Sequence, residues 1–335
     1  MTSALRADML LADGFSMPPQ THKRDGSQRR VGFEIEFSGL DIDTASSAVA
    51  AATSGTLEQN TSSEHTVHSD LGAFAIEVDW QFLKKQAREA ASRDDKSDWT
   101  VTLRELAKTF VPVEVVCPPI PLESLGELDI VTESLREQGA QGTEASLVSA
   151  YGVHINAEAP DLNAETLHRY LRAFSLLQWW LVREHDVDIA RRASSYVRNY
   201  PEAYLHSVHE LRDPTQADVM EHYLDHNATR NRALDMLPLF AEIDEDMVRS
   251  ATGDDRIGSR PTFHYRLPDS RVDAEGWDLS IPWNKWCVVE ALAADPESIE
   301  ALSAEFRTSS RGPLGVSKEE WIARIDQWLS DRASA

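Results

Sequence analysis

The stretch of sequence that decides the fold is Arg30-Val-Gly-Phe-Glu-Ile-Glu-Phe37. From Val31 onward, apolar residues occupy every second position, which is the period of a β-strand. Successive side chains of a strand point to opposite faces, so Glu34 and Glu36 would share one face. The other face would carry Val31, Phe33, Ile35 and Phe37. We therefore predict an amphipathic strand that buries hydrophobic side chains behind two carboxylates.

Four later stretches, residues 74–80, 111–117, 151–157 and 262–267, predict further strands. In a single strand, one solvated face is enough to explain such alternation, and no function is needed. A solvated face usually mixes Lys, Thr, Ser and Gln, however. The polar positions of these strands carry instead Glu77 and Asp79, then Glu114, then His154 and Asn156, and finally His264 and Arg266.

These side chains are the kinds that bind metals and phosphates. Five carboxylates on neighbouring strands would repel one another strongly unless cations lay among them. Hard oxygen ligands suit Mg²⁺ or Mn²⁺, and these ions bring nucleotide phosphates with them. The strands together therefore predict a site for a divalent cation and a nucleotide.

The order of the elements predicts an α+β chain, with strands first and helices mostly later. Helices are expected at residues 43–53, 81–91, 122–138, from about 160 to 240, and 283–329, with Gly55 ending the first. Residues 1–28 lack periodicity and are expected to form a flexible leader, with order beginning at Arg29. Residues 29–335 would then form a single domain, because no linker divides them cleanly.

The composition excludes several classes of partner. The net charge of −23 repels nucleic acid and anionic membranes, so neither is expected to bind. No stretch approaches the roughly 20 apolar residues of a membrane span, and the apolar run near the start is too short for a signal peptide. The two cysteines, Cys117 and Cys287, lie far apart and lack metal spacing, which favours reduced thiols. We therefore expect a cytoplasmic protein.

Known catalytic motifs are missing from the sequence. There is no Walker A loop, no Gly-x-Gly-x-x-Gly, no Gly-x-Ser-x-Gly and no Cys-x-x-Cys. On motif grounds this excludes P-loop NTPases, Rossmann dehydrogenases and α/β-hydrolases. A nucleotide would need another kind of site, with local positive charge or metal ions.

Five segments, in order along the chain, resemble the signatures of the amidoligase family. They are residues 30–40, 112–119, 151–156, 226–238 and 260–268. That family belongs to the carboxylate–amine ligases related to glutamine synthetase and glutamate–cysteine ligase. The resemblance covers about residues 30 to 295. It implies a curved antiparallel sheet of the glutamine synthetase catalytic-domain type, backed by helices, with the cleft on its concave side.

The resemblance also implies a reaction. ATP, as a co-substrate, would phosphorylate a substrate carboxylate, and an amine would then displace phosphate to form an amide. Mg²⁺ or Mn²⁺ would be the metal cofactor. Transfer of a phosphoryl group depends mainly on positioning and on neutralising its charge, which fits a site built from metal ligands and arginines.

Roles follow from the same resemblance. The implied metal ligands are Glu34, Glu36, Glu77, Glu114, His154 and His264. Nucleotide and phosphate groups would bind Asn156, Arg230, Arg232 and Arg266, and the groups closest to catalysis would be Glu36, His154 and Arg266. For Arg230 and Arg232, a salt bridge at a helix end is the alternative. His264 stands where relatives often have glutamate, so one metal position would have a changed ligand.

Two other functions stay open. A metal-dependent phosphohydrolase would use the same carboxylates to activate water, and a non-catalytic binding protein could keep the fold without the reaction. Under the ligase hypothesis, the partners are small-molecule or peptide substrates that carry the carboxylate and the amine. The acceptor could be an amino acid, a peptide, a polyamine or a cell-wall fragment. The sequence does not decide whether the protein forms a homo-oligomer.

Overall fold

The computed structural model describes residues 14–79, 112–143, 151–188, 191, 197–309 and 315–333. The helix predicted at residues 81–91 lies outside these ranges. Within them, no helix is long and apolar enough to cross a bilayer.

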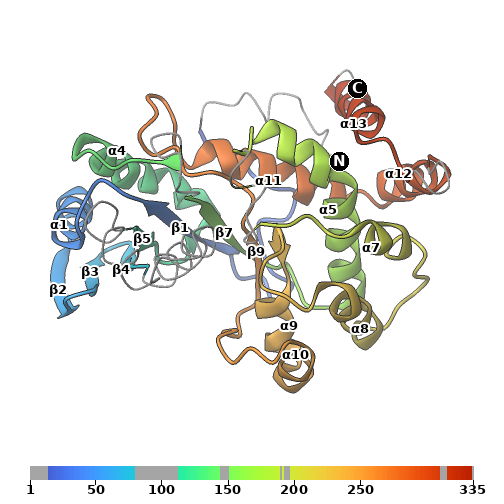
Figure 1. Cartoon of the computed structure of the whole chain (residues 1–335), viewed down its shortest axis with the longest axis horizontal. Coiled ribbons are helices and arrows are strands. Elements are labelled where there is room, and N and C mark those ends of the chain that lie inside the picture. Colours follow the sequence, from blue (N-terminus) through green and yellow to red (C-terminus); the bar gives the residue numbers. More distant parts are fainter. Residues whose placement is uncertain are drawn as a thin grey trace, which may run out of the picture.

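A nine-stranded antiparallel sheet forms the centre of the structure, in the order β2-β3-β4-β5-β1-β7-β9-β8, with β6 paired to β1. The strands are β1 (Arg30–Phe37), β2 (Thr56–Thr61), β3 (Glu64–Ser69), β4 (Gly72–Val78), β5 (Val113–Val116), β6 (Ile120–Pro121), β7 (Val153–Glu158), β8 (Leu234–Asp235) and β9 (Thr262–Tyr265). The sheet is open and curved (Figure 1), so the predicted α+β class is confirmed. The likeness to glutamine synthetase stays a prediction.

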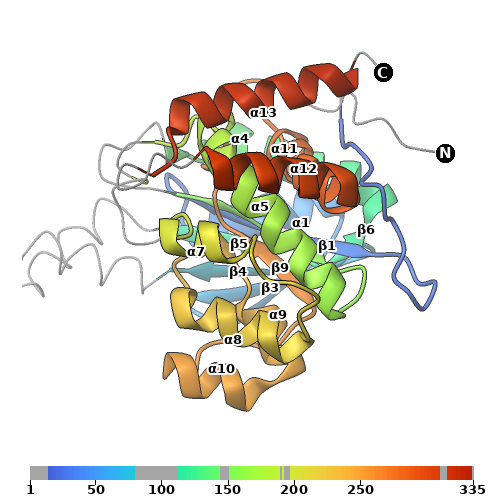
Figure 2. The ribbon, with the colours of Figure 1, turned by 90° about the vertical axis from the view of Figure 1, so that its right-hand side faces the viewer.

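Ten α-helices and a 3₁₀ helix lie among the described residues. They are α1 (Ile42–Thr53), η2 (Leu122–Leu128), α4 (Asp129–Glu137), α5 (Ala164–Glu184), α7 (Glu202–Ser207), α8 (Gln216–Asn227), α9 (Leu237–Ile243), α10 (Glu245–Thr252), α11 (Ser280–Ala293), α12 (Pro296–Thr308) and α13 (Lys318–Ala333). Helices α4, α5 and α11 lie on one side of the sheet, and α8, α9 and α10 lie on the other side beside β9 (Figures 1 and 2).

The apolar face of β1 packs against the helices behind the sheet. Phe33 is fully buried, and its ring meets that of Trp283 in α11 edge-on at 6.5 Å. Tyr170 of α5 stacks on Phe263 of β9 at 4.2 Å. Burying an aromatic side chain contributes roughly 1.5–3 kcal/mol. This packing fixes which face of each strand is buried, and it therefore turns the alternate, polar side chains to the opposite face.

Two regions of the structure differ from the predicted elements. Sequence analysis assigned no strand to residues 56–69, yet β2 and β3 form a hairpin there. The side chains of β2 are almost all exposed, so the hairpin at this edge has little hydrophobic alternation to detect. The predicted helix at 122–138 divides into η2 and α4.

Helix α1 ends at Thr53, but the residue that caps it is not the predicted glycine. Ser54 adopts the left-handed conformation, with φ 51°, in place of Gly55. Gly55 is required for a different reason: a Cβ atom there would lie 2.6 Å from Cγ1 of Val67. The glycine therefore allows β3 to pass close to the end of the helix.

Residues 14–28 lie against the body of the protein. The Phe15 ring is 6.4 Å from that of Phe33. The backbone of Ser16 accepts a hydrogen bond from Nε1 of Trp283 and donates one to Asn284, both at 2.8 Å. The division into a leader and one domain stays a prediction, but a loose leader over residues 14–28 would not make these contacts.

Candidate functional site

A row of glutamates crosses the open face of the sheet. Glu64 of β3 lies opposite Glu77 of β4, Glu77 lies opposite Glu114 of β5, and Glu114 lies opposite Glu36 of β1. Neighbouring strands are about 4.8 Å apart. Like charges directly opposite one another destabilise a sheet. These four residues, which we call the acidic row, therefore need protons or cations among them.

The pKa values of two members of the row reflect this crowding. Burial raises the pKa of Glu114 well above its usual value, and the negative charges of Glu34 and Glu36 raise it further. Burial also raises the pKa of Glu77, as do the charges of Glu64 and Glu34. Both carboxyls therefore hold protons more tightly than they would in water, and a bound cation would displace those protons.

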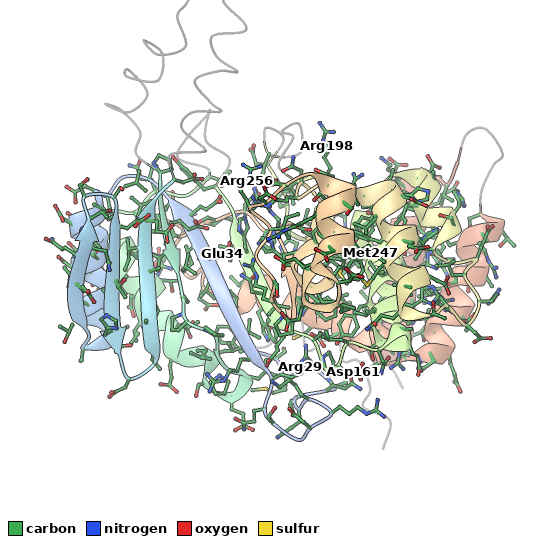
Figure 3. The ribbon with its side chains drawn as sticks, turned by 90° about the horizontal axis from the view of Figure 1, so that it is seen from below. Arg29, Glu34, Asp161, Arg198, Met247 and Arg256 are labelled. Atoms are coloured by element: carbon green, nitrogen blue, oxygen red, sulfur yellow. The ribbon has the colours of Figure 1, made fainter. Side chains whose placement is uncertain are left out.

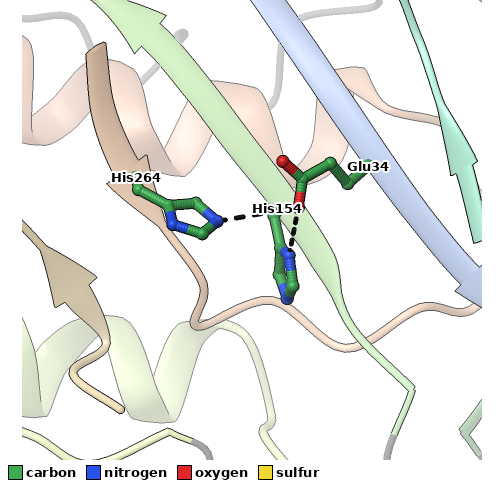
Figure 4. A group of neighbouring side chains, drawn as sticks. All are labelled: Glu34, His154 and His264. Carbon is green, nitrogen blue, oxygen red and sulfur yellow. Dashed lines mark hydrogen bonds and ion pairs between the residues drawn. The ribbon is translucent and has the colours of Figure 1, made fainter. Parts of the chain in front are cut away.

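Beside the row, Glu34 meets two histidines (Figure 4). Its Oε2 atom lies 2.7 Å from Nδ1 of His154 and 3.6 Å from Nε2 of His264. Its Oε1 atom accepts a hydrogen bond of 2.8 Å from Nδ2 of Asn156. Burial alone would raise the pKa of Glu34, but the hydrogen bond of His154 and the charges of both histidines outweigh it and hold that pKa well below its usual value. Burial lowers the pKa of His154, which favours a neutral ring.

Arginines lie across from the carboxylates. Arg230 and Arg256, from the segments after α8 and α10, line the same cavity as Arg266, which follows β9. Arg266 donates a hydrogen bond of 2.8 Å from Nη1 to the backbone oxygen of Arg230. Figure 3 shows Glu34 on β1, between the strands on the left of the view and the helices on its right. Arg256 lines the same cavity as Glu34.

The acidic and basic groups enclose one cavity of about 620 Å³, a volume within the range of ligand-binding pockets. It is lined by Glu34, Glu36, Glu77, Val78, Asp79, Glu114, His154, Ala228, Thr229, Arg230, Asn231, Thr252, Asp254, Arg256, His264 and Arg266. The lining has carboxylates and imidazoles on the sheet and guanidinium groups on the loops beside it. Such a separation of charge suits a ligand that carries both cations and phosphates.

Comparison with known proteins assigns the chain to a family. A family model described as "Putative amidoligase enzyme" matches residues 27–288, more than three quarters of the chain. The chain belongs to the amidoligase family. The family name indicates an enzyme of the ligase type. No curated protein and no solved structure matches the chain.

The structure brings together most of the residues that the sequence singled out in this amidoligase. Nine of them line the cavity: Glu34, Glu36, Glu77, Asp79, Glu114, His154, Arg230, His264 and Arg266. Asn156 does not line it and contacts Glu34 instead. Arg232 also lies outside it. Its guanidinium donates to the backbone oxygens of Asn199 and His226 at 3.0 and 2.9 Å, so it is held near the end of α8 by neutral acceptors and not by the salt bridge of the alternative prediction.

Sequence analysis missed the loop residues of the cavity. Arg256, Asp254 and Asn231 lie outside any strand, so no alternation marks them. Arg256 is held by Asp254, with bonds of 2.8 and 2.7 Å from its Nε and Nη2 atoms. These residues reach the cavity only because the loops after α8 and α10 fold back toward the sheet.

The residues of this amidoligase fit a divalent cation in two places. Glu34, His154 and His264 each offer a ligand atom within 4.8 Å of the others, and so do Glu36, Glu114 and His154. Both ring nitrogens of His264 are buried without a hydrogen-bond partner among the described residues. Unpartnered imidazole nitrogens beside carboxylates fit a set of metal ligands.

Proposed function

We propose that this amidoligase joins a carboxylate to an amine, using ATP and a divalent cation, Mg²⁺ or Mn²⁺. The observation that carries the proposal is the opposition of carboxylates and arginines across one cavity. The acidic groups alone would suit many cations, and the arginines alone would suit many anions. Together they suit a nucleotide whose phosphates lie between metal ions and guanidinium groups.

The residues divide into two tasks. Glu36, Glu114, Glu34 and the two histidines would hold the metal, which supplies charge neutralisation for the phosphates. Arg266 and Arg230 would bind the equatorial oxygens of the transferred group, because a guanidinium offers several donors in a fixed plane. Arg266 is well suited to this task, since its Nη1 atom donates a hydrogen bond to the backbone oxygen of Arg230, which holds the guanidinium beside the cavity.

The chemistry would proceed in two steps. An oxygen of the substrate carboxylate attacks the γ-phosphorus of ATP, and the bond to the bridging oxygen of ADP breaks. The amine nitrogen then attacks the acyl carbon, and phosphate leaves with the former carboxylate oxygen. The amine gives up a proton as the amide forms. Glu77 can accept it, because its raised pKa makes it a stronger base than an ordinary glutamate.

The acidic row also bears on the second substrate. Glu64 and Glu77 lie on the part of the row farther from the arginines and the histidines, toward the edge strand β2. A protonated amine would be attracted there before it loses its proton. The proposal therefore favours amines that are cationic in solution over neutral or anionic nucleophiles.

Release of ADP from the purified chain tests the proposal, with Mg-ATP and paired libraries of acids and amines. Once a pair is found, the acid is labelled with ¹⁸O in its carboxylate. The ligase chemistry transfers one labelled oxygen to the phosphate. Glu36→Gln should abolish turnover. Glu58→Gln, a matched change on an exposed glutamate of β2 outside the cavity, should not.

The isotope also distinguishes the main alternative. A metal-dependent phosphohydrolase would release ADP without any acid or amine, and its phosphate would take ¹⁸O from labelled water. That outcome would overturn the ligase proposal while keeping the cavity as an active site. Failure of ATP to bind at all would favour a non-catalytic protein.

A further inference from the structure

The environment of His264 differs from that of an ordinary buried histidine. The residue is 4% exposed, and neither ring nitrogen has a hydrogen-bond partner within the part of the chain that the structure describes. Other buried histidines of the chain do have partners: His185 bonds the hydroxyl of Tyr265, and His168 bonds the backbone oxygen of Val208. Buried polar atoms without partners are rare, and each needs a physical reason.

Carboxylates face both nitrogens of His264 at distances that are too long for hydrogen bonds. Nε2 lies 3.6 Å from Oε2 of Glu34, and Nδ1 lies 3.8 Å from Oδ2 of Asp235. A transition ion takes its nitrogen and oxygen ligands at about 2.0–2.2 Å. Two ligand atoms 3.6 Å apart can therefore belong to one ion, whereas they cannot bond each other well.

The backbone fixes this arrangement. His264 is the direct cross-strand partner of Asp235 in β8 and of Asn156 in β7. Asp235 is 1% exposed, and its other oxygen, Oδ1, accepts the backbone N–H of Leu237 at 2.9 Å. Asp235 lies behind Nδ1 of His264 while Nε2 faces Glu34, so this carboxylate is placed to orient the ring when His264 binds an ion, although the 3.8 Å separation is not itself a hydrogen bond. Asn156 holds the third ligand, Glu34, through a hydrogen bond of 2.8 Å.

We propose that Glu34, His154 and His264 form a cation position that selects a transition ion, Mn²⁺, Co²⁺ or Zn²⁺, over Mg²⁺. Imidazole nitrogen suits these ions, whereas Mg²⁺ prefers carboxylate, carbonyl and water oxygens. This choice of ion deepens the proposed function, and any role of the ion in catalysis rests on that function. The binding preference itself rests only on the ligand set.

The acidic row offers a contrasting position in the same cavity. Glu36 and Glu114 supply oxygen ligands, and His154 is their only nitrogen neighbour in the group. His154 is shared: Nδ1 faces Glu34 at 2.7 Å, and Nε2 lies 3.7 Å from Oε1 of Glu36. A neutral imidazole has one lone pair, so it can complete one of the two positions at a time. If His154 binds the ion at the position of Glu34 and His264, the acidic row keeps only oxygen ligands, which suit Mg²⁺.

Metal binding by the full chain, without nucleotide, tests the inference. Mn²⁺ binding to metal-free protein is followed by electron paramagnetic resonance, and Mg²⁺ is added as a competitor. We expect Mn²⁺ to bind roughly tenfold or more tightly than Mg²⁺ at this position. His264→Glu should abolish most of that preference, because it replaces a nitrogen ligand with an oxygen ligand. His68→Glu, on an exposed strand residue outside the cavity, should leave the preference unchanged.

Asp235→Asn is the second variant, and it keeps an acceptor for the N–H of Leu237. It should weaken Mn²⁺ binding by about 10-fold or more while Mg²⁺ binding to the row is retained. Thermal melts of each metal-free variant show whether it folds. If a variant does not fold, the competition between Mn²⁺ and Mg²⁺ for the wild-type protein decides the inference alone. Equal binding of Mn²⁺ and Mg²⁺ by the wild type would overturn the inference, as would an unchanged preference in folded His264→Glu. The assay contains no ATP, so failure of the ligase proposal would not affect it.

Discussion

Glu34 and His154 are cross-strand partners in β1 and β7, and Nδ1 of His154 lies 2.7 Å from Oε2 of Glu34. This contact makes Glu34 different from the other carboxylates of the open face. Glu34 has donors around it, whereas Glu114 has other carboxylates around it, and the pKa of Glu34 is lowered where that of Glu114 is raised. The two residues should therefore respond in opposite ways to neutralisation.

Glu34→Gln should destabilise the metal-free protein by about 1–3 kcal/mol, because charge-assisted hydrogen bonds from His154 and Asn156 are weakened. Urea unfolding of the metal-free variant measures this. Glu58→Gln serves as the control, since Glu58 is exposed on β2. A variant as stable as the wild type would show that Glu34 does not depend on these donors.

Glu114→Gln should leave the metal-free protein as stable or make it more stable at pH 8. The change removes a buried charge that faces Glu36 and Glu77 across neighbouring strands. Urea unfolding of the variant in EDTA measures its stability. A loss of several kcal/mol would instead mean that the carboxylate of Glu114 is paired with a cationic group in the folded protein.

Stability should also depend on pH in a direction that the row determines. Glu114 has a folded pKa above its usual 4.5, so the metal-free fold loses stability as pH rises from about that value through the raised pKa. Glu34 acts oppositely: its contribution is present above 4.5 and is lost as pH falls through the lowered pKa. Melting temperatures of metal-free protein should therefore fall toward alkaline pH, and less so in Glu114→Gln. A wild-type profile that is flat, or that rises with pH, would contradict this.

Gly152→Ala should destabilise the protein near the site. A Cβ atom there would overlap the guanidinium of Arg191, which holds the backbone oxygens of Arg266, Leu267 and Pro268. The backbone N–H of Gly152 also donates to Oε2 of Glu36 at 2.6 Å. We expect a loss of about 1–3 kcal/mol, as in other overpacked sites. Gly258→Ala, where an added Cβ has open space, should cost much less in the same unfolding experiment.

Strand alternation explains why much of the sheet could be predicted. Glu34, Glu36 and Glu114 could be assigned to a polar face because the side-chain direction of a strand is a local property. The row itself could not be read from the sequence, since it requires the register that places Glu36 opposite Glu114 and Glu114 opposite Glu77.

The basic side of the cavity was harder to predict. Arg266 follows a strand and could be recognised, but Arg256 lies in a loop after α10, and only tertiary folding brings it near Glu34. The choice between Arg230 and Arg232 could not be made either. A single residue separates them, yet Arg230 lines the cavity while Arg232 binds the backbone oxygens of Asn199 and of His226 in α8. The conformation of the loop decides which side chain reaches the cavity, and loops have no periodic pattern in the sequence that would predict this.

Titration of the purified chain with ATP in a calorimeter tests the central claim most directly, once with Mg²⁺ or Mn²⁺ and once with EDTA. The account predicts that ATP binds only with the metal and that Glu36→Gln weakens this binding by orders of magnitude, while Glu58→Gln binds ATP as the wild type does. Equal affinity for ATP in EDTA and in metal would contradict the claim that the acidic face holds cations for a nucleotide.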